Sequence, residues 1–510
     1  LASGAVFGLS HNLTIMESLS IADSLENKTF LVTGAAGFLA KVFVEKILRV
    51  QPNVKRMYLL VRAPDSNSAT KRLHHEVISK DLFKVLREKH GANLNSFIAK
   101  KVIPVAGDIS CENLGVKDAG LKEQMLSEIE VVVNSAATTK FDERYDVALG
   151  INSFGAMHVL NFAKKCAKIQ LLVHVSTAYV AGERAGVIAE RPFEMGEALN
   201  GMGGLDILAE EKVIRDKLCE LHSEGTTDKD ITLAMKDLGI KRAQTYGWPN
   251  TYVFTKAMGE MILGKLTGTQ PLILMRPTII TSTIEDPFPG WVEGTRTIDS
   301  FSAGYGKGQL SFFLGDPTTI LDVIPADMVV SSMICAMAMA HKVRRGLGGA
   351  PVAVYHVASS AGNPVRCADL QDFGLRYFTK NPWIDGDGRA VKVGQLRSLT
   401  MASFHRYALF RYLLPLKGLQ LANAVLCQLF RKTYLSLNRK IRLVMRLAEL
   451  YRPYTFFKGM FDDANAEELR KATREAAVDA DEFCFDPKLI DWEDYFLNKH
   501  LPGLVEYVLH

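Results

Sequence analysis

A glycine-containing turn near the start of the chain, residues 33–40 (TGAAGFLA), limits the fold more than any other feature of the sequence. The apolar run at residues 30–32 before it has the character of a short buried strand. Behind it, Leu39, Phe43 and Ile47 recur at the spacing of one helix face. A strand, a glycine turn and a helix in this order are the setting of a dinucleotide-binding fingerprint. An ordinary glycine turn would look the same locally, so the rest of the chain must decide between the two interpretations.

The small residues of the turn have physical roles in the dinucleotide-binding interpretation. Gly34 allows the tight turn, Gly37 lets the backbone approach a pyrophosphate, and Ala40 stands where a small residue permits close packing of helix and strand. The amides at the helix start then face the phosphates, helped by the positive end of the helix dipole. The expected cofactor contacts in this turn are Thr33, Gly34, Ala36, Gly37, Phe38 and Leu39.

Further apolar runs predict an α/β fold. They are continuous rather than alternating, as in strands buried on both faces, and helical segments separate them. We therefore expect a Rossmann-type, doubly wound parallel sheet covered by helices, with a helical C-terminal region. The predicted strands are residues 30–33, 57–61, 102–106, 131–134, 171–175 and 273–275.

Length and local composition predict how the chain is divided. A chain of 510 residues suits two or more domains. We expect a weakly ordered N-terminal segment at residues 1–27, a catalytic domain at 28–365 and a helical domain at 366–510. A charged insert at about residues 183–246 lacks clear strand signals, so we expect it to form helices and loops outside the sheet.

The C-terminal region combines apolar, basic and aromatic residues. Leucine, arginine and lysine recur at helical spacing from residue 397 to 448, and residues 451–461 are rich in aromatic side chains. A basic amphipathic helix of this kind can lie on a membrane surface, or it can pack against its own domain. The chain contains no uncharged apolar run of about 18 residues, so the sequence gives no support for a spanning helix.

The overall charge and the cysteines exclude several classes of protein. The net charge of +5, from 61 basic and 56 acidic residues, is too small to indicate nucleic-acid binding. The 7 cysteines are scattered and contain no CxxC pair. We therefore expect neither a metal site nor a disulfide framework, and a reducing compartment.

Residues at the strand ends predict the choice of cofactor. Arg62 follows the second strand, where a fingerprint selective for NAD would carry an acidic residue for the ribose 2′-hydroxyl. A cation there neutralises a 2′-phosphate, so NADPH is predicted, although a solvated surface arginine is the alternative. Asp108, which precedes Ile109 after the third strand, can accept a hydrogen bond from the adenine amino group. The other expected cofactor contacts are Ile109, Asn134, Ala136, Ala137, Pro277 and Thr278, together with Tyr252 and Lys256.

Tyr252 and Lys256 are the predicted catalytic pair. They are four residues apart in a helical stretch, so their side chains share one face. A cation beside a phenol lowers the pKa of the phenol from about 10 towards neutrality, which suits a proton donor to a carbonyl oxygen. Thr177, or alternatively Ser176, can donate a second hydrogen bond to that oxygen. Asn152 can bond a neighbouring backbone and support a water relay to Lys256, or it can be an ordinary polar helix residue.

Several longer motifs resemble one family within the extended short-chain dehydrogenase/reductases. The resemblance is to plant alcohol-forming fatty acyl-CoA reductases of the male-sterility type, and it runs from about residue 28 to residue 510. The separate glycine and Tyr-x-x-x-Lys patterns are common, whereas the whole set is specific. The motifs are TGAAGFLAKVFV (33–44), VVNSAATTKFDERYDV (132–147), VSTAYV (175–180), YGWPNTYVFTKAMGEM (246–261), DPFPGWVE (286–293), LDVIPADMVV (321–330) and YRPYTFFKGMF (451–461).

The resemblance implies a reaction and its residues. Members of this family reduce a long-chain acyl-CoA, in two NADPH-dependent steps through a bound aldehyde, to a primary alcohol used in wax, suberin and pollen-wall lipids. The family's active tyrosine, lysine and hydroxyl residue fall on Tyr252, Lys256 and Thr177. If Met16 is the native start, we expect a peripheral protein on the cytosolic face of the endoplasmic reticulum, or a cytoplasmic one. If residues 1–15 belong to a transit peptide, we expect plastids.

Three other functions stay open at the level of the sequence. An acyl-carrier-protein-dependent plastid reductase would share every residue named above. A sugar-nucleotide epimerase or dehydratase, or a hydroxysteroid-type dehydrogenase, would share the glycine turn and the Tyr-x-x-x-Lys pair, but not the long helical C-terminal region. A non-enzymatic dinucleotide sensor would need neither Tyr252 nor Lys256. The acyl chain length and the oligomeric state stay undetermined.

Overall fold

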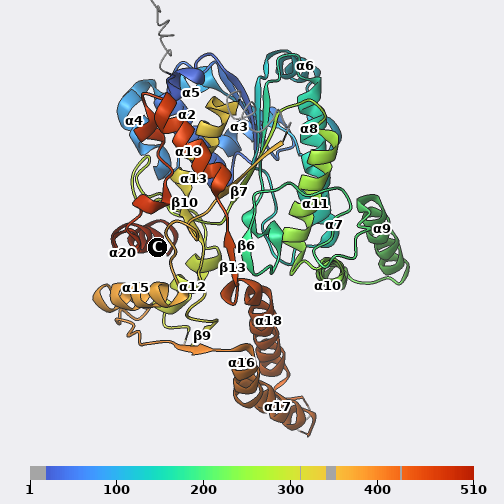
Figure 1. The fold of residues 1–510 in the computed structure, drawn as a ribbon. Coiled ribbons are helices and arrows are strands. Elements are labelled where there is room, and N and C mark those ends of the chain that lie inside the picture. Colours follow the sequence, from blue (N-terminus) through green and yellow to red (C-terminus); the bar gives the residue numbers. More distant parts are fainter. Residues whose placement is uncertain (1–18, 311, 341–351, 426–427, 510) are drawn as a thin grey trace, which may run out of the picture.

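The computed structural model describes residues 19–310, 312–340, 352–425 and 428–509. Its centre is a seven-stranded, fully parallel sheet with the strand order β11-β7-β5-β4-β1-β2-β3 (Figure 1). The predicted α/β, Rossmann-type fold is therefore confirmed. The strands are β1 (Thr29–Thr33), β2 (Arg56–Val61), β3 (Val102–Ala106), β4 (Val131–Asn134), β5 (Leu171–Val175), β7 (Leu272–Pro277) and β11 (Val352–Val357).

The six strands predicted from apolar runs are all present, with small differences at their ends. The edge strand β11 was not predicted. Its sequence, VAVYHV, carries the polar His356 inside the apolar run, and a glycine turn does not follow it. His356 is nevertheless fully buried, because its backbone and ring both find partners there.

Helices cover both faces of the sheet, as a doubly wound fold requires (Figure 1). Alternate side chains of β1 divide between the faces: Phe30 and Val32 belong to one apolar core, and Leu31 belongs to the other. The first face carries α2 (Phe38–Val50), α3 (Ser66–Leu73), α4 (Lys84–His90), α5 (Leu94–Lys101) and α13 (Ala326–Ala338); the second carries α6 (Ala119–Glu128), α8 (Gly155–Lys165) and α11 (Thr251–Leu266).

The charged insert lies outside the sheet, as predicted, but it also contains a strand. Its helices, α9 (Ile207–Ser223) and α10 (Asp228–Thr245), pack near the short helix α7 (Tyr145–Ala148). The strand β6 (Gly186–Ile188) pairs in parallel with β13 (Gly459–Phe461). The expectation of helices and loops alone was wrong here, because a three-residue strand whose partner is so distant in sequence leaves no local periodicity.

The C-terminal half first builds a small assembly beside the sheet and then extends away from the body. The extension consists of α16 (Met401–Ala408), α17 (Leu414–Val425) and α18 (Arg431–Thr455), and we call it the helical arm (Figure 1). The preceding elements are β8 (Ile279–Thr281), α12 (Thr297–Gly306), β9 (Phe312–Leu314), β10 (Val323–Pro325), α15 (Cys367–Lys380) and β12 (Arg397–Leu399); β8 pairs with β10, and β9 with β12.

After the helical arm the chain returns to the sheet. The helix α19 (Ala464–Ala476) packs on β11 and α13, and the short helices α20 (Trp492–Asp494) and α21 (Leu501–Leu504) complete the core. Residues 1–18 of the N-terminal segment lie outside the described residues. Residues 19–27 include the helix α1 (Ile21–Ser24), whose first amides donate to the carboxylate of Asp479.

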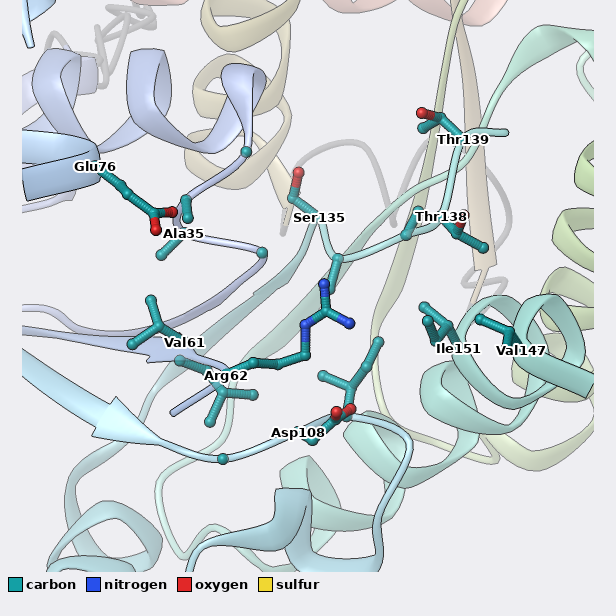
Figure 2. Close-up of a pocket in the computed structure, with 18 of the residues that line it drawn as sticks. Ala35, Val61, Arg62, Glu76, Asp108, Ser135, Thr138, Thr139, Val147 and Ile151 are labelled. Carbon is teal, nitrogen blue, oxygen red and sulfur yellow. The ribbon is translucent and has the colours of Figure 1, made fainter. Parts of the chain in front are cut away.

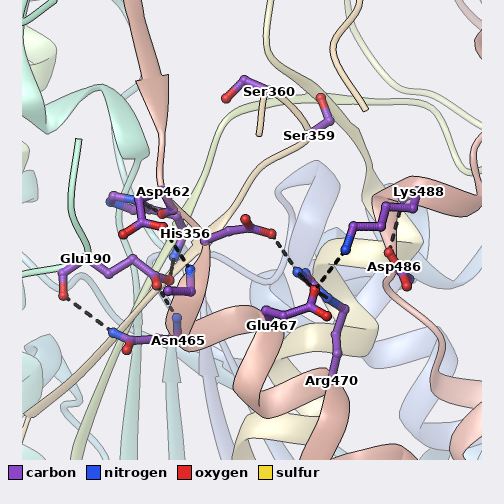
Figure 3. A network of polar contacts seen from close by, with 12 residues as sticks. Glu190, His356, Ser359, Ser360, Asp462, Asn465, Glu467, Arg470, Asp486 and Lys488 are labelled. Carbon is purple, nitrogen blue, oxygen red and sulfur yellow. Dashed lines mark hydrogen bonds and ion pairs between the residues drawn. The ribbon is translucent and has the colours of Figure 1, made fainter. Parts of the chain in front are cut away.

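A partly buried polar network connects α19 to the edge of the sheet (Figure 3). The Glu190 carboxylate accepts hydrogen bonds from the backbone amides of His356, at 2.6 Å, and Asn465. The Asn465 side chain donates to the Val354 carbonyl at 3.0 Å, and Arg470 pairs at 2.6 Å with Asp463. The insert, the edge strand β11 and the returning C-terminal helix therefore share one set of hydrogen bonds.

Glu190 makes this junction sensitive to pH. Burial, which has the largest effect, and the nearby carboxylates of Asp463 and Asp462 raise the pKa of Glu190 from 4.5 to about 8, against the lowering effect of the two amide donors. The folded protein therefore retains a proton that the unfolded chain releases at a lower pH. The stability that this proton contributes is present below about pH 4.5, and it is lost as the pH rises through about 8.

We predict that Glu190→Gln flattens this pH dependence. From about pH 5 to about pH 8, the wild-type free energy of unfolding should fall relative to the variant by up to about 1.4 kcal/mol per pH unit. Chemical denaturation across this range measures the difference. Glu475→Gln, an exposed change on α19, the helix whose first turn Glu190 bonds, should keep the wild-type slope. Identical slopes for wild type and Glu190→Gln would contradict the assignment.

Candidate active site

The glycine turn between β1 and α2 passes very close to the chain that follows β4. Gly34 has a φ of +69°, and a Cβ atom there would lie 2.7 Å from the backbone nitrogen of Ala136. Gly37 is the N-cap residue of α2 and brings no capping side chain, so the first amides of the helix are left for another acceptor. This geometry is the one that an anion-binding helix start requires.

A cavity of about 520 Å³ lies over this turn at the carboxyl ends of β1, β2 and β4. Figure 2 shows the Arg62 side chain reaching into the middle of it, with Asp108 nearby and Glu76 beyond the glycine turn. Arg72 donates to the Arg62 carbonyl at 2.7 Å and to Glu76 at 2.8 Å, which holds the loop in place. The predicted cofactor residues on its wall are Gly34, Ala36, Gly37, Arg62, Asp108, Ile109, Ala136 and Ala137.

A second cavity of about 510 Å³ adjoins the first, and Gly37 and Ala137 line both. It brings together the predicted catalytic side chains Thr177, Tyr252 and Lys256. The predicted cofactor contacts Phe38, Leu39, Pro277 and Thr278 line the same wall. Two other predicted contacts, Thr33 and Asn134, lie beneath the turn and do not line either cavity.

The environment of Tyr252 differs from the one expected. Burial raises the pKa of Tyr252 to about 12, and the effects that lower it come from the Thr177 hydroxyl and the Arg296 guanidinium. The expectation that Lys256 brings the pKa of this phenol towards neutrality was wrong. The Lys256 amine instead donates to the Val175 carbonyl at 2.7 Å and lies 3.1 Å from Nε2 of His174. The phenol therefore keeps its proton at neutral pH.

His174 joins Lys256 to a buried chain of hydrogen bonds. The Ala136 amide donates to Oγ1 of Thr33 at 3.2 Å, so the Thr33 hydroxyl donates to Oδ1 of Asn134 at 2.6 Å. Nδ2 of Asn134 then donates to Nδ1 of His174 at 3.0 Å, which leaves the proton of the neutral imidazole on Nε2, facing Lys256.

The pKa values of His174 and Lys256 are both lowered, which favours the uncharged forms that this direction of the hydrogen bonds requires. Burial, and then the charge of Lys256, hold the pKa of His174 well below its usual range. Burial lowers the pKa of Lys256 to about 8, against the raising effect of Glu260. Lys256 can therefore accept a hydrogen bond as a neutral amine and exchange a proton near neutral pH.

The sequence analysis identified neither His174 nor the individual C-terminal residues that line the site. His174 was visible as a polar residue inside an apolar strand, opposite Asn134 in the sheet register. Leu447, Leu450, Tyr451 and Tyr454 of α18 also line the catalytic cavity, although the helix is far from it in sequence. The aromatic composition of residues 451–461 was the available signal.

The remaining candidates have structural partners. The Asn152 side chain donates to the Thr138 carbonyl at 3.1 Å and to Thr255 at 3.0 Å, so the expected bond to a neighbouring backbone is present. Ser176 lines the catalytic cavity beside Thr177, and its buried hydroxyl has no partner among the described residues. Within the described part of the chain, we find no group of three or more His, Cys, Asp and Glu side chains placed to hold a metal ion.

Comparisons with known proteins identify the family. Residues 32–333 match a family profile described as male sterility protein, and residues 411–510 match a second profile with the same description. The chain is 55% identical over 492 residues to an alcohol-forming fatty acyl-CoA reductase of Simmondsia chinensis, covering 96% of this chain and 99% of the relative. This chain belongs to the male-sterility family of fatty acyl-CoA reductases.

Further family members and a solved structure agree with this result. Fatty acyl-CoA reductase 1 of Arabidopsis thaliana is 54% identical over 489 residues, covering 95% of this chain and 98% of the relative. The reductase domain of a nonribosomal peptide synthetase from Mycobacterium tuberculosis superposes with a TM-score of 0.51 at 19% identity, covering 96% of this chain and 94% of that chain. The latter supports the fold alone.

Proposed function

We propose that this protein is an alcohol-forming reductase that uses NADPH to convert a long-chain fatty acyl-CoA, through a bound aldehyde, into a primary alcohol. The observation that carries the proposal is the meeting of the Thr177 and Tyr252 hydroxyls in one cavity with the helix-start turn at Gly37. The kinship to alcohol-forming relatives over nearly the whole chain supports the same reaction. Products of this kind serve in wax, suberin and pollen-wall lipids.

NADPH supplies the hydride for each of the two reductions. In the first, the Thr177 and Tyr252 hydroxyls donate to the thioester oxygen and stabilise the oxyanion that forms as hydride adds to the carbon. The tetrahedral intermediate expels the CoA thiolate, which takes up a proton, and an aldehyde is left. In the second, Tyr252 transfers its proton to the aldehyde oxygen as hydride adds, and the product is the alcohol. Lys256, whose pKa of about 8 lets its ammonium form release a proton near neutral pH, returns a proton to Tyr252 and takes up another from water that enters the catalytic cavity.

The choice of NADPH rests on Arg62. Its guanidinium reaches into the cofactor cavity, and Arg72 supports the loop from behind. The same wall carries three carboxylates, Glu76, Asp108 and Glu143. Arg72 pairs with Glu76 at 2.8 Å, and Lys140 pairs with Glu143 at 3.5 Å. A guanidinium placed in this way suits a 2′-phosphate better than a free hydroxyl.

We predict that Tyr252→Phe abolishes most of the alcohol formation while the protein stays folded. Removing the proton donor should lower kcat by about a hundred- to ten-thousandfold. NADPH oxidation with hexadecanoyl-CoA, with products identified by gas chromatography, measures it. Tyr58→Phe removes a hydroxyl that bonds to Glu128, outside the cofactor and catalytic cavities, and should keep wild-type turnover. Near-normal alcohol formation by Tyr252→Phe would remove this residue from the mechanism.

We predict that Arg62→Asp reverses or removes the preference for NADPH. The new carboxylate repels a 2′-phosphate and can accept from a ribose hydroxyl, so the ratio of kcat/KM for NADPH over NADH should fall at least about tenfold. Steady-state kinetics with both cofactors give the ratio. Arg389→Asp, an exposed change outside the site, serves as the control. If the ratio does not change, Arg62 does not bind the phosphate.

We also propose that the helical arm contacts an anionic lipid surface, with the protein on the cytosolic face of the endoplasmic reticulum. The arm exposes large apolar side chains such as Phe410 (68%), Leu421 (70%) and Leu429 (75%). Within the described residues, no helix has both the length and the apolar character to cross a membrane. Residues 401–455 carry a single acidic residue, Glu449, and the basic residues Arg406, Arg411, Lys417, Arg431, Lys432, Arg439, Lys440, Arg442, Arg446 and Arg452. Apolar and basic side chains together suit the interface of an anionic membrane.

Reversing four of these charges should release the protein from lipid. At about 1 kcal/mol per cation, replacing Arg431, Lys432, Arg439 and Lys440 by Glu should weaken binding to vesicles containing phosphatidylserine more than about a hundredfold. Co-sedimentation measures it. A matched control replaces Lys212, Arg215, Lys229 and Lys241, which are exposed on α9 and α10, by Glu. Equal binding of the two variants would contradict the proposed contact.

A further inference from the structure

A third cavity, of about 330 Å³, lies between the small assembly beside the sheet and the two ends of the helical arm, namely α16 and the C-terminal part of α18. Its wall comes from α12, β9, α15, α16 and α18 and from Phe496 and Leu501 near the C-terminus. Phenylalanine rings dominate the wall: Phe301, Phe312, Phe313, Phe404 and Phe496. None of its described lining residues is Asp, Glu, Lys, Arg or His. Such a wall favours a hydrocarbon and excludes a charged group.

This cavity is joined to the catalytic cavity. Thr297, Leu447, Tyr451 and Tyr454 line both. The ring of Tyr454 stacks on Phe141, with centroids 4.8 Å apart, and Phe141 in turn stacks on Tyr252 at 6.2 Å. A row of three aromatic rings, Tyr454, Phe141 and Tyr252, therefore connects the wall of the apolar cavity with the proposed proton donor, Tyr252.

We propose that this cavity, the acyl cavity, holds the hydrocarbon chain of the thioester, and that Ala448 and Ser302 limit the length of chain it accepts. The inference rests on the proposed function and adds a substrate subsite to it. A chain that starts at the carbonyl beside Thr177 and Tyr252 reaches the acyl cavity past Tyr451 and Tyr454. Its burial against the phenylalanine wall supplies binding energy in proportion to the apolar area removed from water.

Ala448 is the smallest side chain that α18 contributes to this wall, and the smallest from α12 are the two serines, Ser300 and Ser302. Neither Ala448 nor Ser302 lines the catalytic cavity. A larger side chain at either position reduces the volume available to the acyl chain and leaves Thr177, Tyr252 and Lys256 unchanged.

The acyl cavity also reaches the surface. Its lining residues Val444 and Leu447 are 43% and 42% exposed, and they lie on α18 beside Leu443, which is 57% exposed. The cavity therefore opens to the surface at α18, beside exposed apolar side chains of the helical arm. A chain dissolved in a lipid surface can enter the cavity from there without passing through water.

The test is the chain-length profile of Ala448→Phe and Ser302→Phe, with acyl-CoAs from octanoyl to tetracosanoyl. Both variants should lose at least about tenfold in kcat/KM for the longest substrates that the wild type accepts, since a pocket short of one or two methylenes discriminates by this much. Turnover of octanoyl-CoA should stay within about threefold of wild type, because the reacting groups are untouched. Ala402→Phe makes the same change at an exposed position of α16 and should keep the wild-type profile.

Binding separates this inference from the proposed function. Calorimetry with the non-reducible thioether analogues of octanoyl- and hexadecanoyl-CoA should show Ala448→Phe weakening the longer ligand selectively. Absence of alcohol from every thioester with the wild type would refute the proposed reaction, while the calorimetric difference would still report on the cavity. An unchanged profile, or a loss that is equal at every chain length in both variants, would overturn the acyl cavity.

Discussion

A row of buried polar side chains at the carboxyl ends of three adjacent strands supports the whole site. In the parallel register, Thr33 of β1 lies beside Asn134 of β4, and Asn134 lies beside His174 of β5. All three are at most 1% exposed, so a hydrogen bond left unmade among them would cost about 1–3 kcal/mol. A one-residue slip of any strand would turn its polar residue to the opposite face. The position of Lys256, at the end of this row, is therefore set by the sheet itself.

The Rossmann sheet alone does not complete the catalytic cavity. Asn250 caps α11, the helix of Tyr252, through its Oδ1 atom, and its amide nitrogen donates at 2.9 Å to the Tyr454 hydroxyl at the end of α18. The pairing of β13 with β6 and the packing of α19 on β11 hold the chain immediately after α18 against the body. The C-terminal half thus contributes to the geometry of the reacting groups, and not only to the shape of a remote pocket.

The sequence predicted the parts of this protein that depend on local patterns. Six strands, the glycine turn and the Tyr252–Lys256 pair each have a short-range signature, namely an apolar run, a φ > 0 position or a helical spacing. The strands β6 and β11 have no such signature. β6 is three residues long and pairs with a strand that is distant in sequence, and β11 carries the polar His356 within its apolar run. The pKa of Tyr252 was also beyond prediction, since the helical spacing places Lys256 on the same face but does not reveal that Val175 and His174 hold its amine.

The three joined cavities differ in charge along their length, and this difference sets the direction in which a substrate can lie. The cofactor cavity is lined by the cations Arg62, Arg72 and Lys140 and by three carboxylates, and the catalytic cavity is lined by Lys140, Lys256, Arg296 and Asp142. The third cavity offers aromatic and aliphatic side chains with a few neutral hydroxyls. An acyl thioester of CoA has a polyanionic end and a hydrocarbon end. The desolvation free energy of phosphates moved into the apolar cavity would exceed any favourable contact there, whereas transfer of the hydrocarbon chain out of water lowers the free energy. The thioester carbon can therefore meet Thr177 and Tyr252 in one orientation, with the chain behind Tyr454 and the polyanionic end of CoA outside the apolar cavity.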